Sequence, residues 1–116
     1  MRETTQTVDA LFAGKDTVVL AIYQRLLDVL HMLGPFREEP KKTSIHLVHS
    51  SGFAGIHPRK TFLYLTLRMA RSLHSERIAK SEQVSKNRYH NEVKIASPDE
   101  LDDELISWLK EAYTLV

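Results

Sequence analysis

The sequence contains no cysteine, which excludes disulfides, thiolate metal sites and cysteine nucleophiles. It also has no run of about eighteen apolar residues, which excludes a transmembrane helix. The first residues, MRETTQTVDALFAGK, lack the apolar stretch and the small-residue cleavage site of a signal peptide. No repeat, low-complexity tract or linker divides the 116 residues. We therefore expect one cytoplasmic domain over residues 1–116, without membrane contact.

The charged residues are unevenly distributed along the chain, although the net charge is only +1. Residues 40–94 hold eleven Lys or Arg against three Asp or Glu, whereas residues 97–116 hold one Lys against six acids. The hydrophobic share of 42% and the charged share of 27% are ordinary for a globular domain. The basic segment therefore predicts a face for an anionic partner.

A long amphipathic helix is predicted near the N-terminus. It begins after Asp16 as N-cap and ends at Gly34–Pro35. Its apolar residues recur at steps of three and four, which places them on one face. These residues are Val19, Ile22, Leu26, Val29 and Leu33. A shorter helix over Val8–Phe12, starting from Thr7, is expected before it.

The C-terminal segment carries the clearest helix signal. Ser97 is expected as the N-cap, with Pro98 at the first helical position and Glu100 completing a capping box. The acids that follow crowd the positive end of the helix dipole, so the fold explains them without a partner. The buried stripe of this helix is expected to comprise Leu101, Leu105, Trp108, Leu109 and Ala112.

Between the helices, apolar and polar residues alternate with period two, which is typical of strands. The strand candidates are Thr43–Ser50, Phe53–Pro58, Thr61–Arg68 and Arg88–Ile95. Ile78 and Val84 hint at one further strand that turns at 85–87 into the last one. This order predicts an α+β fold: an antiparallel β-sheet of about four to five strands, with an N-terminal and a C-terminal helix packed on one face.

The register of the sheet decides which side chains share a face. A two-residue turn at Ser51–Gly52 would place His46 opposite His57, and a turn at Arg59–Lys60 would place His57 opposite Phe62. A three-residue turn with a bulge is the alternative at the first position. Alternation then sorts the side chains into two sets. The helix-covered set is aliphatic: Ile45, Leu47, Ala54, Ile56, Leu63, Leu65, Leu67, Val93 and Ile95. The outer set is Ser44, His46, Val48, Phe53, Gly55, His57, Phe62, Tyr64, Thr66, Arg68, His90, Glu92 and Lys94.

The outer face is the candidate functional surface because it gathers histidines, aromatic rings and basic side chains. Rings interleaved with Lys and Arg can stack bases and hold phosphates, and a twisted sheet can also cradle a small anion. The first hypothesis is therefore a non-catalytic binding module for a small anionic ligand, nucleic acid or a protein partner. Its predicted ligand-binding residues are Lys42, Ser44, His46, Phe53, His57, Arg59, Phe62, Tyr64 and His90.

Other hypotheses stay open for the same face. A small enzyme could use His46 or His57 as general acid or base, although no motif marks a nucleophile or a phosphate loop. A homodimer could bury the aromatic rings without any ligand. Metal binding is disfavoured because His46 and His49 alternate onto opposite sheet faces. We therefore predict no metal ligand, no cofactor and no catalytic residue.

Several segments together resemble a known family of small bacterial domains. They read KTSIH at 42–46, F-A-x-I-x-P-R-K at 53–60, R-Y-x-N-E-V-K-I at 88–95 and SPDELDDELISWLKEAY at 97–113. The family is the domain-of-unknown-function family numbered five-six-five-five. The resemblance covers nearly the whole chain, and the C-terminal motif is its most specific part.

The resemblance implies a small α+β domain without an established activity, so no catalytic residue is carried over. Relatives often have a second histidine where Asn91 stands here, which further disfavours a metal site. Members are sometimes labelled as transport proteins, although this sequence has no stretch that could span a membrane. The residues that match the motifs are Lys42, Thr43, Ser44, His46, Phe53, Pro58, Arg59, Lys60 and His90.

Overall fold

A computed structural model describes residues 8–115 of the chain. The helices are α1 (Val8–Phe12), α2 (Thr17–Leu33) and α3 (Asp103–Leu115), and a 3-10 turn, η1 (Pro98–Glu100), precedes α3. The strands are β1 (Arg37–Pro40), β2 (Ile45–Val48), β3 (Gly52–Pro58), β4 (Leu63–Met69), β5 (Ile78–Ser85) and β6 (Arg88–Ile95). None of these described helices is long and apolar enough to cross a membrane.

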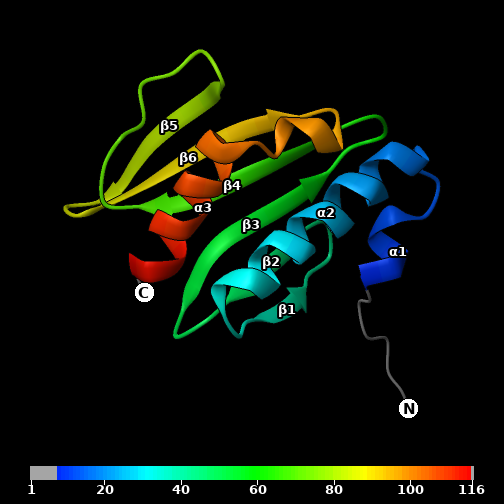
Figure 1. Cartoon of the computed structure of the whole chain (residues 1–116), viewed down its shortest axis with the longest axis horizontal. Helices are drawn as coiled ribbons and strands as arrows, with labels where there is room; N and C mark the ends of the chain where they lie inside the picture. The colour runs from blue at the N-terminus through cyan, green and yellow to red at the C-terminus, as the bar shows by residue number, and fades with distance from the viewer. Residues whose placement is uncertain (1–7, 116) are drawn as a thin grey trace.

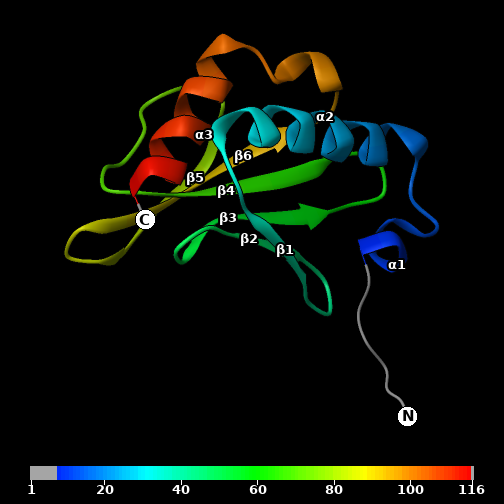
Figure 2. The ribbon, with the colours of Figure 1, turned by 60° about the horizontal axis from the view of Figure 1, so that its bottom comes forward.

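The six strands form one antiparallel sheet in the order β1-β2-β3-β4-β6-β5 (Figure 1). Figure 2 shows α2 and α3 on the same side of this sheet. The predicted α+β fold is therefore confirmed, with six strands where about four to five were expected. The strand suggested by Ile78 and Val84 exists as β5.

The additional strand is β1, whose sequence REEP contains no apolar residue. It pairs with β2 at the edge of the sheet, where Pro40 is tolerated because an edge position does not need every backbone N–H. The hydroxyl of Tyr23 on α2 donates a 2.6 Å hydrogen bond to Glu38 Oε1 and ties β1 to the helix layer. Burial and the Glu38 carboxylate together raise the pKa of Tyr23 far above its ordinary value, so the phenol stays protonated.

The core lies between the sheet and the two long helices. The aliphatic set predicted for the helix-covered face is buried throughout, and most of its members are fully inaccessible. Each long helix buries an apolar stripe: Val19, Ile22, Leu26, Val29 and Leu30 from α2, and Leu105, Trp108, Leu109 and Ala112 from α3. The prediction named Leu33, which is only partly buried, and did not name Leu30. Leu101 is buried as predicted but lies before α3. Burying one such large side chain stabilises the fold by about 1.5–3 kcal/mol, so this layer dominates the stability.

The start of α3 differs from the prediction of one continuous helix from Ser97. The Ser97 hydroxyl accepts a 3.2 Å hydrogen bond from the Asp99 N–H, but it caps only the short turn η1. Asp102 caps α3 itself, because its Oδ1 accepts from the Leu105 N–H at 3.1 Å. Arg77 holds this junction by ion pairs of 2.8 Å to Asp102 and 3.0 Å to Glu104.

The register differs from the prediction by two residues at both turns. His46 lies opposite Gly55, not His57, and His57 lies opposite Tyr64, not Phe62. A shift of two preserves the alternation, so the side chains keep their predicted faces. Phe53 is the exception, because a bulge opposite Leu47 and Val48 inserts it as an extra residue. The bulge turns the Phe53 ring into the core, where it is fully buried.

Candidate functional site

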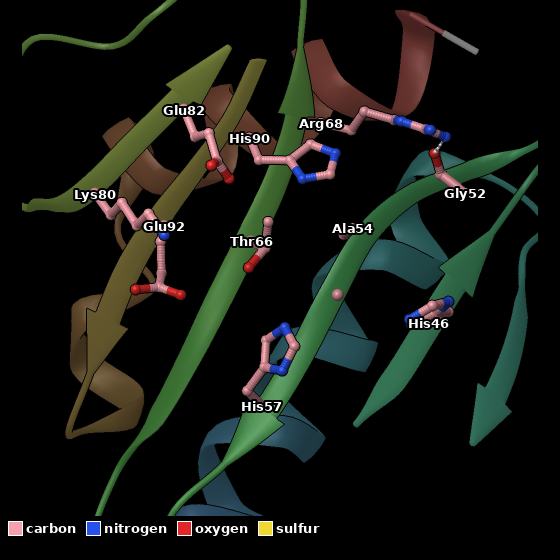
Figure 3. Close-up of a pocket in the computed structure, with 11 residues that line it drawn as sticks. His46, Gly52, Ala54, His57, Thr66, Arg68, Lys80, Glu82, His90 and Glu92 are labelled. Carbon is pink, nitrogen blue, oxygen red and sulfur yellow. Dashed lines mark hydrogen bonds between the residues drawn. The ribbon is translucent and has the colours of Figure 1, made fainter. Parts of the chain in front are cut away.

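The outer face of the sheet contains an open hollow of about 390 Å³ (Figure 3). Its floor consists of residues with little or no side chain, and its walls consist of longer polar side chains. The floor residues are Gly52, Ala54, Gly55 and Thr66. The wall residues are His46, His57, Arg68, Lys80, Glu82, His90 and Glu92. We call these eleven residues the outer-face hollow.

The register explains why a hollow forms at this place. One row of directly opposed residues runs across five strands, and its centre is small: His46, Gly55, Thr66, Glu92 and Lys80. The next row places Arg68 opposite His90, which in turn lies opposite Glu82. Opposed side chains stand side by side on one face, so the two rows build walls around the small residues.

Arg68 is the unusual side chain of the hollow. Its Nη1 donates a 2.9 Å hydrogen bond to the Gly52 carbonyl, which draws the guanidinium from β4 toward β3. Its Nε is covered from solvent, and it is the one buried side-chain nitrogen or oxygen among the described residues that has no hydrogen-bond partner in the protein. Leaving a buried donor unsatisfied costs about 1–3 kcal/mol, more for a charged group. The fold itself gives this donor no acceptor.

Two histidines in the walls have a pKa below the ordinary value of 6.5. Burial lowers the pKa of His57 most; Glu92 opposes this effect, whereas Arg59 and His46 reinforce it. Burial also lowers the pKa of His90, Arg68 lowers it further, and Glu82 opposes both. Both rings are therefore neutral at neutral pH, and each offers one N–H donor and one acceptor nitrogen.

The wall on the β5–β6 side carries two carboxylates, Glu82 and Glu92, with Lys80 beside them. Within residues 8–115, no ion pair shorter than 4.0 Å engages any of these three side chains. The carboxylates are therefore free to accept hydrogen bonds from a ligand, and an ionised carboxylate can only accept.

Three of the nine predicted ligand-binding residues line the hollow: His46, His57 and His90. Phe62 and Tyr64 instead form an aromatic cluster with two cations beside it. Their rings meet edge to face at 5.2 Å, Lys94 lies 4.4 Å from the Phe62 ring centre, and Arg59 lies 5.6 Å from that of Tyr64. Lys42 is exposed and lies outside the hollow.

Two predicted site residues are not available on the surface. Phe53 was expected on the outer face, but the bulge places its ring in the core, edge to face with Tyr113 at 5.3 Å. Ser44 is buried at 7% exposure and does not line the hollow. The predicted cross-strand pair of His46 and His57 is also wrong, because Gly55 stands opposite His46.

Most of the hollow was not in the predicted site. Alternation along β4 and β6 places Thr66, Arg68 and Glu92 on the outer face, so a signal for them exists in the sequence. Lys80 and Glu82 have no such signal, because β5 is exposed along nearly its whole length and lacks an apolar alternation. The small floor residues could only be recognised once the register was known.

Asn91 has a structural role on the opposite side of β6. Its side chain is fully buried. Its Oδ1 accepts hydrogen bonds from the Leu73 N–H at 3.0 Å and the Ser81 hydroxyl at 2.8 Å, and its Nδ2 donates to the Arg71 carbonyl at 3.0 Å. Position 91 thus anchors the segment before β5 and does not face the outer histidines. Among the described residues, no three His, Asp or Glu side chains meet in a way that could hold a metal ion.

Comparison with known proteins identifies the family. A family model described as "Domain of unknown function (DUF5655)" matches residues 8–116. The chain therefore belongs to this family, and the resemblance of its motifs is confirmed. No curated protein and no solved structure matches the chain.

Proposed function

We propose that this domain binds a small polar ligand with an anionic group in the outer-face hollow. The observation that carries the proposal is Arg68, whose buried Nε lacks a partner in a hollow that three histidines share. A volume of about 390 Å³ lies within the range of small-molecule sites, about 300–1,000 Å³. We further propose that residues 1–116 are one bacterial domain that works in the cytoplasm. The lack of cysteine is in line with that compartment.

The anion would lie against the guanidinium of Arg68. Arginine presents several N–H donors in a fixed plane, and its hydrogen bonds to carboxylate or phosphate oxygens are charge-assisted and short. The neutral rings of His57 and His90 add N–H donors without the cost of burying further charge. Gly55 leaves room beside β3, so that a ligand can approach the backbone closely.

Binding rather than catalysis is favoured by the hydrogen bonds of the site. Nucleophilic catalysis needs a hydroxyl or thiol activated by a neighbouring base. In the described part of the chain no histidine forms a side-chain hydrogen bond to a hydroxyl, and the hydroxyl in the hollow, that of Thr66, has no hydrogen-bond partner in the protein. We therefore assign the histidines to ligand contact.

A titration with propyl phosphate followed by amide NMR tests the proposal. We expect saturable shifts at Gly55, Thr66 and His90, and little change on the helix layer. The variant Arg68→Gln should weaken binding by about tenfold or more, since it removes a charge-assisted contact. Arg88→Gln, which removes the same charge at the β5–β6 turn, should bind as the wild type does. Equal affinity of the two variants would sink the proposal, as would shifts that never saturate.

A further inference from the structure

We infer that the ligand is bipolar: an anionic group at the Arg68 end and hydrogen-bond donors, ammonium or hydroxyl, at the Glu82 and Glu92 end of the same hollow. The inference rests on the proposed function and names the second half of the ligand. Its basis is that the Arg68 guanidinium, with a donor left unsatisfied, and the carboxylates of Glu82 and Glu92, which form no ion pair, line the same hollow. The small floor residues lie between them.

The charges of the hollow are separated in space. Figure 3 shows the Arg68 guanidinium near Gly52 at the β3 side, whereas the carboxylates of Glu82 and Glu92 extend from β5 and β6. Lys80 is the other cation of the hollow, and it lies opposite Glu92. The β5–β6 wall therefore carries a net charge of about −1 and the Arg68 end about +1, when ordinary ionisation states are assumed.

The two ends of the hollow are linked by His90, which stands opposite Arg68 on β4 and opposite Glu82 on β5. Glu92 lies opposite Thr66, two residues along β4 from Arg68, which is a diagonal neighbour on the same face. Such diagonal neighbours are about 7–8 Å apart at Cα. His90 is influenced from both ends, since Arg68 lowers its pKa and Glu82 opposes this effect.

A ligand with only an anionic group would form hydrogen bonds with the Arg68 end and none with Glu82 and Glu92. Its remaining atoms would lie against carboxylates that can only accept hydrogen bonds, and a second negative charge would be repelled. A ligand with ammonium or hydroxyl groups at the other end satisfies both walls. Glu82 is exposed and Glu92 is half-buried, so specificity in this site comes from charge repulsion and from charge-assisted hydrogen bonds.

Three probes with the same three-carbon chain test the inference by calorimetry: propyl phosphate, glycerol 3-phosphate and 3-aminopropyl phosphate. We expect the two probes with donors to bind at least about tenfold more tightly than propyl phosphate. A preference for 3-aminopropyl phosphate assigns an ammonium group, and a preference for glycerol 3-phosphate assigns hydroxyl groups. Either preference supports the inference.

The double variant Glu82→Gln/Glu92→Gln checks the cause of this preference. It should reduce the advantage of the donor-bearing probes to about threefold or less and should leave propyl phosphate bound at least as tightly. Glu76→Gln/Asp99→Asn removes the same charge outside the hollow and should retain the advantage.

The outcomes separate the two proposals. Equal affinity for all three probes overturns the bipolar ligand while the phosphate site at Arg68 stands. An advantage that survives in Glu82→Gln/Glu92→Gln also overturns it, because the donors would then bind elsewhere. Failure of all three probes to bind at millimolar concentration overturns both proposals.

Discussion

The two faces of β4 differ in how deeply their side chains are buried. On the helix side, Leu63, Leu65 and Leu67 have no exposed surface. On the outer side, Tyr64, Thr66 and Arg68 are half-buried, and two of them line the hollow. The same strand thus serves stability with one set of residues and, as we propose, binding with the other. Because the core does not depend on the outward side chains of β4, these positions can vary with function without a large loss of stability.

The largest effect is expected from Leu65→Ala on the helix side. It removes a fully buried side chain and leaves a cavity, so it should lower the free energy of unfolding by about 2–5 kcal/mol. Thr66→Ala, the next residue along the strand, should change it by about 0.5 kcal/mol or less. Urea denaturation of both variants provides the measurement, and equal losses would contradict the division between the two faces.

Asn91→Ala is expected to have the next largest effect. It leaves the Leu73 N–H and the Arg71 carbonyl without their partner in a buried place, so the free energy of unfolding should fall by about 1–3 kcal/mol. Asn87→Ala, in the exposed turn before β6, is the control and should be nearly neutral. Hydrogen exchange of the Leu73 amide should accelerate in Asn91→Ala alone; unchanged exchange would show that Asn91 does not anchor this segment.

A smaller effect is expected from pH through the two outer-face histidines, His57 and His90. The pKa of His57 and of His90 lies below 6.5 in the folded protein, so the unfolded chain binds protons more readily. Their contribution to stability is complete above about pH 6.5 and is lost as the pH falls toward the folded pKa values. Compared with His57→Gln/His90→Gln, the wild type should therefore lose more stability on acidification.

Urea denaturation of both proteins at several pH values measures this difference. Phosphate affinity should change in the opposite direction, because protonated histidines add positive charge to the hollow. Parallel stability profiles for the wild type and the double variant would contradict the assignment of lowered pKa values.

Much of the fold could be predicted because a helix or strand that buries one face carries apolar residues at regular steps in the sequence. The helices and four of the six strands follow from it, as do the faces of Leu47, Ile56 and Val93. β1 could not be predicted, because REEP is an edge strand held by backbone pairing and one side-chain bond to Tyr23. The 3-10 turn before α3 was also missed, since Ser97 provides a cap for either kind of helix.

The candidate site was less predictable than the fold because it depends on register. The histidines could be assigned to the outer face by alternation, yet the predicted register was wrong by two residues. The bulge at Phe53 arises from the pairing of β2 with β3, which local sequence does not determine. The carboxylates of β5 come from a strand that buries almost nothing, so they lack the apolar pattern that reveals other strands.

Gly55→Val tests the central claim most directly, because it fills the floor of the hollow from within a well-ordered strand. A Cβ at this position would lie 3.6 Å from His57 Nε2 and 3.9 Å from Thr66 Cβ, which are ordinary contact distances. We predict that the free energy of unfolding stays within about 1 kcal/mol of the wild-type value, since β-branched residues suit strands. Binding of propyl phosphate should be lost, whereas Ala79→Val on exposed β5 should retain it. A stable Gly55→Val protein that binds propyl phosphate with wild-type affinity would contradict the account.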